Sequence, residues 1–143
     1  MRFGILGALQ VTDDVGRPLA LAAPKQRAVL TILLLHANEF VSSDRLAEDL
    51  WAGMAPASAA KSLQVHVSRL RRALSHAPDS PEERLVTVAG GYLMRVLPGE
   101  LDAELFERVT AEASALIDVG DRESALAKLR LALDLWRGRP LSD

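Results

Sequence analysis

The apolar residues between positions 57 and 75 recur at helical spacing. They follow one another at steps of four, three and four residues: Leu63, Val67, Leu70 and Leu74. At ~100° per residue they form one narrow stripe. The opposite side carries polar and basic residues and one valine: Lys61, Val65, Ser68, Arg69 and Arg72. The pattern predicts a helix that rests on a core with one side and can meet a polyanion with the other, as a helix in a DNA major groove does.

Taken alone, this pattern also fits a surface helix with a solvated basic side. The segments that precede it favour the DNA-binding interpretation. Residues 2–12 are β-prone and broken by Gly7, which predicts two short strands, and residues 17–21 predict a third. Pro24 opens a buried helix that ends near Asn38, a candidate left-handed cap. Ser43 is the predicted N-cap of a short amphipathic helix that reaches Trp51.

The segments that follow it complete the order of a winged helix-turn-helix. Residues 78–81 predict a loop, and residues 84–88 and 92–96 a β-hairpin. Pro98-Gly99 is the natural domain boundary. Two amphipathic helices then follow, joined by Gly120-Asp121.

The predicted fold is mainly α with small antiparallel β-sheets. A winged helix occupies residues 1–97 and a helical hairpin, like the start of a tetratricopeptide array, occupies residues 98–143. Since one hairpin buries little by itself, we expect it to pack against the winged helix. Another chain or further helices are the alternatives.

Composition narrows the class of protein. Apolar residues make up 49% of the 143, which supports a packed core, and there is no cysteine. The net charge of −2 is divided unevenly: residues 1–97 carry 11 Lys and Arg against 9 Asp and Glu, whereas residues 98–143 carry 6 against 10. This difference indicates different partners for the two parts.

No apolar run approaches the ~20 residues of a membrane span, and residues 1–7 do not make a signal peptide. We therefore expect a cytoplasmic, nucleoid-associated protein with no membrane partner.

The sequence predicts no enzyme, cofactor or metal site. His36, His66 and His76 lack metal-ligand spacing. Gly90-Gly91 is too short for a phosphate-binding loop, and no serine has the context of a nucleophile elbow.

Several motifs resemble the Streptomyces antibiotic regulatory protein family, whose N-terminal part is an OmpR-type winged helix. The matching segments are residues 24–27, 33–38, 41–44, 50–51, 62–74 and 90–92, and the Leu-Trp-Arg-Gly tail within residues 132–141 is similar to the opening of that family's bacterial transcriptional activation domain. The resemblance implies a transcriptional activator, often of antibiotic biosynthesis genes. It also implies binding to direct repeats near a promoter beside a second copy, and contact with RNA polymerase holoenzyme. The expected wing tip, residues 89–91, has no basic residue for the minor groove.

The predicted base contacts lie on the third helix: Lys61, Val65, His66 and Arg69. In the resemblance Arg69 matches a residue that reaches into the groove, where arginine can pair with guanine, and Val65 can meet a thymine methyl group. For Arg69, a solvated side chain or a phosphate contact remains the alternative.

The predicted phosphate contacts are more widely spread: Lys25, Arg27, Ser43, Ser62, Ser68, Arg71, Arg72, Thr87 and Tyr92. Such contacts supply affinity and register. A solvated helix end remains equally open for Lys25 and Arg27, capping comes first for Ser43, and packing in the hairpin is the main alternative for Tyr92.

The function predicted from the sequence is therefore sequence-specific binding of double-stranded DNA by a transcriptional activator. Two alternatives stay open: an OmpR-type output domain controlled by a separate sensor or kinase, and a helical interaction module that binds no DNA. Steep salt dependence of duplex binding would distinguish a DNA binder from such a module.

Overall fold

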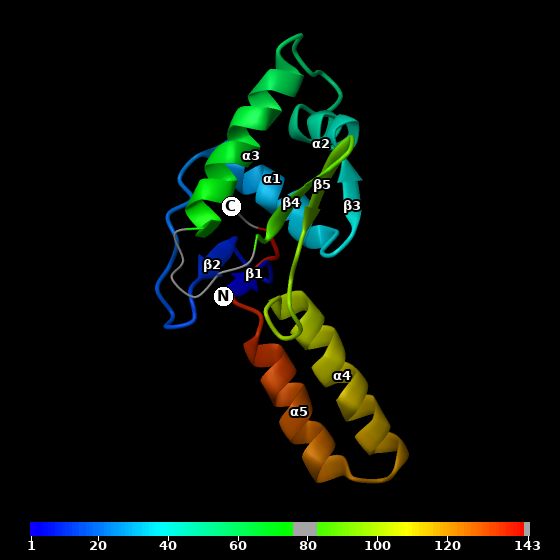
Figure 1. The fold of residues 1–143 in the computed structure, drawn as a ribbon. Coiled ribbons are helices and arrows are strands. Elements are labelled where there is room, and N and C mark those ends of the chain that lie inside the picture. The colour runs from blue at the N-terminus through cyan, green and yellow to red at the C-terminus, as the bar shows by residue number, and fades with distance from the viewer. Residues whose placement is uncertain (76–82, 142–143) are drawn as a thin grey trace. The chain divides into compact units, whose positions relative to one another are not determined.

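The structure is a computed structural model that describes residues 1–75 and 83–141. The elements follow in the order β1 (Arg2–Gly4), β2 (Gln10–Thr12), α1 (Pro24–Leu35), β3 (Phe40–Ser42), α2 (Ser43–Leu50), α3 (Ala59–Ser75), β4 (Leu85–Val88), β5 (Gly91–Met94), α4 (Asp102–Asp118) and α5 (Arg122–Asp134) (Figure 1). The predicted order of helices, with a hairpin after the third, is confirmed. The predicted loop at 78–81 lies outside the described residues. Among the helices described, none is long and apolar enough to cross a membrane.

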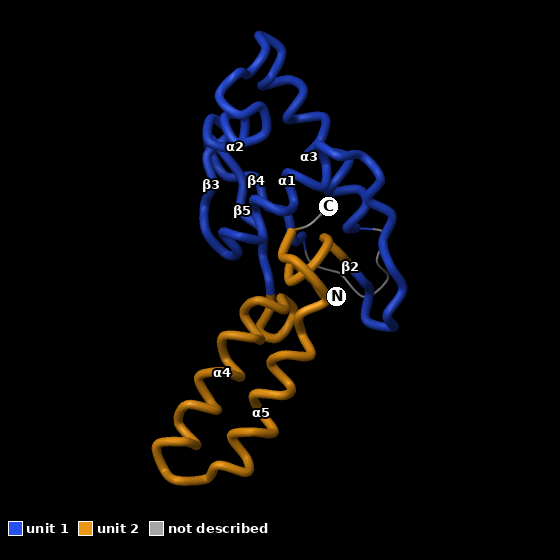
Figure 2. Tube along the Cα trace, turned by 180° about the vertical axis from the view of Figure 1, so that it is seen from behind, with its two compact units in different colours: residues 1, 12–96 blue, residues 2–11, 97–143 orange. Residues whose placement is uncertain are grey.

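The chain forms two compact units (Figure 2). The first unit contains Met1 and Thr12–Val96, and the second contains Arg2–Val11 together with the chain from Leu97 onward. We assigned residues 1–97 to one domain from the sequence, so the placement of Arg2–Val11 beside α4 and α5 is a difference. The sequence gives no sign of this placement, because Arg2–Val11 is only ten residues long and no linker-like composition separates it from the residues that follow.

In the first unit α1 and α2 pack on a three-stranded antiparallel sheet, and α3 packs on α1 and α2. The sheet has the order β3-β5-β4, with Val41 opposite Tyr92 and Leu85 opposite Met94. Each of these elements contributes at least one almost fully buried side chain to the core, and β3 contributes Val41. The larger core side chains are Leu30, Leu33, Leu34, Leu46, Leu63, Leu70, Leu85 and Met94. Helices α1 and α2 therefore form the base on which α3 is held.

Local sequence explains where α1 begins and ends. Pro24 occupies the first turn, where its missing N–H costs nothing. The helix ends with His36 as its C-cap, so the predicted cap at Asn38 was wrong in position. Asn38, two residues later, has the predicted left-handed conformation with φ of 64°, and its N–H donates to the carbonyl of Met94. Its side chain bonds the backbone of Val96 in both directions, at 3.0 and 2.9 Å, and so ties the end of α1 to the chain that leaves β5.

Three other predictions about local structure were wrong. Residues 17–21 form no strand; Pro18, which has no N–H to donate, makes only an isolated bridge with Thr12. Instead, the Asp13 carboxylate accepts the N–H groups of Val15 and Arg17 and closes a turn. Strand β3 was missed because it is three residues long and runs directly into α2. The N-cap of α2 is Ser42, whose hydroxyl accepts the N–H of Arg45, and Ser43 is the first helical residue.

The second unit joins α4 and α5 to the N-terminal strands β1 and β2. Asp102, in the first turn of α4, accepts the N–H groups of Ile5 and Leu6 at 2.9 and 3.0 Å. The backbone N–H of Arg137 donates to the carbonyl of Leu6, and the Arg137 guanidinium lies 3.8 Å from the Asp102 carboxylate. Phe106 of α4 also packs edge to face on Trp136, which lies just beyond the end of α5. The unit is thus closed by hydrogen bonds between its two sequence segments.

Candidate nucleic-acid interface

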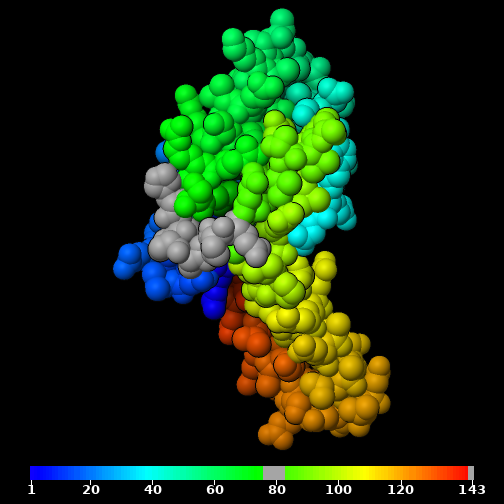
Figure 3. Space-filling view, in the orientation of Figure 1, coloured from blue at the N-terminus to red at the C-terminus, as the bar shows by residue number. Residues whose placement is uncertain are grey.

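Helix α3, drawn in green, lies at the surface of the first unit (Figure 3). Its exposed side carries a polar ridge. Its apolar stripe is buried as predicted: Leu63, Val67, Leu70 and Leu74 are at most 3% exposed. The ridge lies about 160° around the helix axis from this stripe. Its members are all exposed: Lys61, Val65, Ser68 and Arg72. The predicted division of α3 into a buried and an open side is therefore confirmed.

A second row of α3 residues lies between the ridge and the core: Ser62, His66 and Arg69. Their spacing of four and three residues places them along one flank of the helix. Arg69 is exposed, whereas Ser62 and His66 are half-buried. Burial, and then the charges of Arg69 and of Lys25 on α1, lower the pKa of His66. The ring is therefore neutral at physiological pH, and this flank faces the beginning of α1.

Val65 is an apolar residue on the ridge. It is 41% exposed and stands between Lys61 and Ser68, away from the core. Gln64, which lies beside it and is also exposed, was not among the predicted contacts. A search guided by charge passes over a neutral glutamine, although its amide can pair with adenine.

Lys25 and Arg27 are used within the first unit. The Lys25 ammonium donates to the carbonyl of Leu50 at 2.6 Å and lies 5.2 Å from the centre of the Trp51 ring. A cation at the C-terminal end of α2 is favourable for the helix dipole. Arg27 donates to the carbonyl of Leu21. Both side chains therefore fasten α1 to its neighbours.

Arg71 joins α3 to the hairpin. Its Nε donates to the carbonyl of Leu85 at 3.1 Å, and its Nη2 donates to the Thr87 hydroxyl at 2.7 Å. The Glu83 carboxylate is 3.3 Å from the same Nε. Two predicted phosphate contacts, Arg71 and Thr87, thus bind each other and orient β4 against α3. Arg72, one residue later, is exposed on the ridge.

The hairpin tip is tied to α2. The N–H of Ser43 donates to the carbonyl of Gly90 at 2.9 Å, so this amide is occupied by the protein itself. At Gly91, an added Cβ would lie 2.2 Å from the carbonyl oxygen of Val41, which only glycine avoids. Gly91 therefore serves the close approach of β5 to β3, whereas Gly90 takes the left-handed conformation of the turn with φ of 86°. Tyr92 is buried in the hairpin at 9% exposure.

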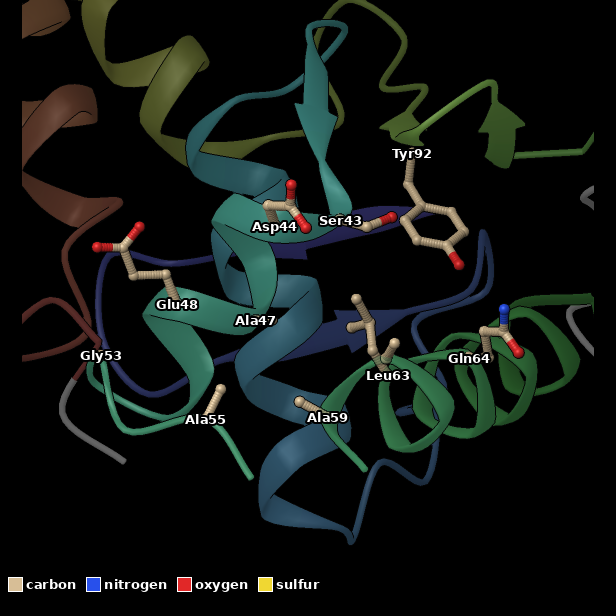
Figure 4. A pocket seen from close by; sticks show the side chains of 11 residues that line it. Ser43, Asp44, Ala47, Glu48, Gly53, Ala55, Ala59, Leu63, Gln64 and Tyr92 are labelled. Atoms are coloured by element: carbon tan, nitrogen blue, oxygen red, sulfur yellow. The ribbon is translucent and has the colours of Figure 1, made fainter. Parts of the chain in front are cut away.

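A hollow of about 540 Å³ lies between α2 and α3 in the first unit. Figure 4 shows Asp44 and Glu48 of α2 on one side and Gln64 of α3 on the other, with Ser43 and Tyr92 near one another at the rim. Its lining includes four alanines and two carboxylates. Since carboxylates repel phosphate, the ridge of α3 is the better candidate for a surface that meets DNA.

Comparison with protein-family models matches both parts of the chain. Residues 16–94 match the family described as "Transcriptional regulatory protein, C terminal", and residues 101–143 match the family described as "Bacterial transcriptional activator domain".

Curated relatives match over nearly the whole chain. Regulatory protein DnrI of Streptomyces peucetius is 36% identical over an alignment of 148 positions, which covers 100% of this chain and 54% of DnrI. Regulatory protein AfsR of Streptomyces coelicolor is 35% identical over 99% of this chain and 14% of AfsR. Transcriptional regulatory protein EmbR of Mycobacterium tuberculosis is 36% identical over 99% of this chain and 36% of EmbR. The chain thus spans about half the length of DnrI and a smaller share of the other two.

Solved structures agree with these matches. The structure of Mycobacterium tuberculosis EmbR in complex with a low-affinity phosphopeptide has a TM-score of 0.93 at 35% identity, covering 99% of this chain and 37% of that one. The DNA-binding domain of Escherichia coli CadC has a TM-score of 0.51 at 28% identity, covering 62% of this chain and 79% of that domain. The predicted fold class, a winged helix followed by a helical hairpin, is confirmed.

Proposed function

The chain belongs to the transcriptional regulatory proteins of the Streptomyces antibiotic regulatory type, and we propose that it activates transcription by binding specific duplex DNA through α3. One observation carries this proposal. The open side of α3 bears exposed Lys61, Arg69 and Arg72 and an exposed Val65, while the opposite stripe is buried in the core. A rigid helix with this division is suited to the major groove.

The proposed base contacts are Lys61, Val65, His66 and Arg69. Arg69 can donate two bonds to guanine O6 and N7, and Val65 can pack on a thymine methyl group. The proposed phosphate contacts on α3 are Arg72, Ser62 and Ser68. Lys25, Arg27, Arg71 and Thr87 would act mainly by holding α1, α2 and the hairpin in place, because their side chains already bind the protein. Ser43, whose N–H binds the carbonyl of Gly90, and Tyr92, whose side chain is largely buried in the hairpin, would act mainly in the same way. This role is regulatory and involves no catalysis.

We further propose that two copies occupy direct repeats near a promoter, contact RNA polymerase holoenzyme and activate secondary-metabolite genes. The likeness to DnrI and AfsR supports this part of the proposal. The expected place of action is the cytoplasm, at the nucleoid. Because the chain spans only part of each relative, the activity of the whole protein is included in this proposal.

The direct test compares two arginine variants of the 143-residue chain. A preferred duplex is selected from random DNA, and Kd is then measured on it and on a scrambled duplex at one salt concentration. We expect Arg69→Ala to weaken binding to the selected duplex by ~1–3 kcal/mol, with a far smaller loss on the scrambled one. Arg130→Ala on α5 removes the same charge from an exposed position and should change neither value much. If Arg69→Ala weakened binding to both duplexes equally, Arg69 would be a phosphate contact and not a base contact.

The spacing of the repeats tests the second copy. Two sites placed ~10–11 bp apart present the same face of the duplex. Inserting about half a turn between them should abolish cooperative binding, measured by gel shift. Cooperativity that survives the insertion would exclude side-by-side binding on one face.

A further inference from the structure

The ring of His66 has two nitrogen atoms in different surroundings. Within the described part of the chain, its Nδ1 is the one side-chain nitrogen or oxygen that is buried without a hydrogen-bond partner. Its Nε2 is not among those buried atoms, and the residue as a whole is half-buried on the flank of α3. Because the protein covers Nδ1, DNA cannot supply its partner. Only Nε2 can reach a ligand.

This difference fixes the position of the ring proton. A charged imidazole would bury an unpaired N–H at Nδ1 in the field of Arg69 and Lys25, which is costly. Of the two neutral forms, one buries an unpaired N–H and the other an unpaired lone pair. Buried N–H groups without an acceptor are rarer than acceptors without a donor. The ring therefore carries its proton on Nε2 and presents a single neutral donor.

We propose that His66 donates a hydrogen bond from Nε2 to the N7 atom of a purine in the major groove. This inference rests on the proposed function, since it requires α3 to lie against the base edges. N7 is the acceptor that adenine and guanine share, whereas the amino groups of cytosine and adenine are donors and are rejected by a donor. Thymine O4 is a further acceptor, and a His66 contact there would be insensitive to the loss of N7 at every purine. A phosphate is the less suitable ligand, because phosphate contacts draw their strength from a positive charge that His66 does not carry.

His66 and Arg69 would then read different features from one flank of α3. Arg69, always charged and with several donors, suits the paired acceptors of guanine. His66, with one donor, suits a position where either purine is accepted and a cytosine, which presents only an amino donor, is not. The buried stripe, and the contact of Arg71 with β4, hold the flank in place while this reading occurs.

The experiment removes N7 from one purine at a time. A duplex selected from random DNA by the 143-residue chain is rebuilt with single 7-deazapurines, which keep base pairing but lack the acceptor. For the unchanged protein, we expect one purine whose replacement raises Kd about three- to tenfold through a His66 contact. For His66→Leu, which suits the buried side of the ring but cannot donate, replacement of that same purine should have no effect. Losses that are equal for the two proteins at every purine would overturn the assignment.

A second variant separates the donor from the rest of the ring. In His66→Gln the side-chain nitrogen stands near the position of Nε2, so the sensitivity to the same 7-deazapurine should persist. Loss of that sensitivity in His66→Gln, with the unchanged protein still sensitive, would overturn the donor assignment. Thermal melting of both variants confirms that each is folded before Kd is compared.

A pH series distinguishes a phosphate contact. If His66 met a phosphate as a cation, binding of the unchanged protein would tighten between pH 8 and pH 6 and that of His66→Leu would not; this result would also overturn the proposal. Failure of the chain to select or bind any duplex is a different outcome, because it rejects the proposed function itself.

Discussion

Helices α3 and α5 have similar apolar spacing but differ in how much of it is buried. In α3 the stripe is buried where the helix packs on α1 and α2, and Leu70 is 0% exposed. In α5 the small residues Ala125 and Ala132 are buried against α4, while Leu133 is 68% exposed and Leu131 51% exposed. A periodic pattern predicts a helix in both cases. It does not say whether the neighbouring elements are large enough to cover the apolar side.

This difference matters for function. A helix that reads DNA must keep its open side in one orientation, which requires complete burial of its other side. The α4–α5 pair is held by Phe106 against Trp136, by the Lys128–Glu112 ion pair at 2.8 Å and by Asp102 at its base.

The strongest contrast is between two leucines. Leu70→Ala empties a fully buried site in α3 and should lower the free energy of unfolding by ~2–5 kcal/mol, because a cavity adds to the lost burial. Leu133→Ala removes a side chain that is mostly exposed and should change it by less than ~0.5 kcal/mol. Urea unfolding followed by circular dichroism measures both. Equal losses would mean that the open face of α5 is covered in solution.

The base of the α4–α5 pair depends on one carboxylate. Asp102→Ala leaves the buried N–H groups of Ile5 and Leu6 without an acceptor, which should cost ~1–3 kcal/mol in the second unit. Hydrogen exchange should accelerate in α4 and α5 and remain unchanged in α1 and α3.

The matched control for Asp102 is Glu107→Ala, which removes an exposed carboxylate further along α4. It should leave both exchange profiles unchanged. If Asp102→Ala loosened α3 as much as α4, the idea that the residue stabilises the second unit by itself would be rejected.

Sequence alone predicted the helices, the hairpin and the buried stripe of α3, because each depends on local spacing. It missed the pairing of Arg2–Val11 with α4, since hydrogen bonds such as Asp102 to Ile5 join residues 97 positions apart. At the candidate site, the positions of Lys61, Val65 and Arg69 on the open side followed from periodicity. The use of Arg71 within the fold did not, because it depends on the carbonyl of Leu85 in a strand whose register the sequence does not specify.

Loosening the β4–β5 hairpin should have a smaller effect on stability. Arg71→Met removes the donors to Leu85 and Thr87 but keeps the aliphatic length, and should cost about 1 kcal/mol of stability, with faster exchange in β4. The slope of log Kd against log salt on a non-specific duplex should stay unchanged. Arg72→Met, on the ridge, should lower this slope by about one contact. A reduced slope for Arg71→Met would instead make Arg71 a phosphate ligand.

The smallest expected effect comes from the flank of α3. Burial, and then the charges of Arg69 and Lys25, hold the pKa of His66 below its ordinary value of 6.5 in the folded chain. The unfolded chain therefore binds this proton more readily, so folding stability falls as the pH drops below about 6.5 and is unaffected by this group above it.

His66→Leu should remove that part of the pH dependence. The measured quantity is the difference between the urea midpoints at pH 7.5 and pH 5.5, which should be smaller in His66→Leu than in the unchanged protein. Because α4 and α5 hold no histidine, hydrogen exchange at low pH should show the change in α1 and α3 and not in the second unit. An identical pH dependence in His66→Leu would show that the ring is charged or neutral to the same degree in the folded and unfolded chain, and the buried state of Nδ1 would then have no energetic consequence.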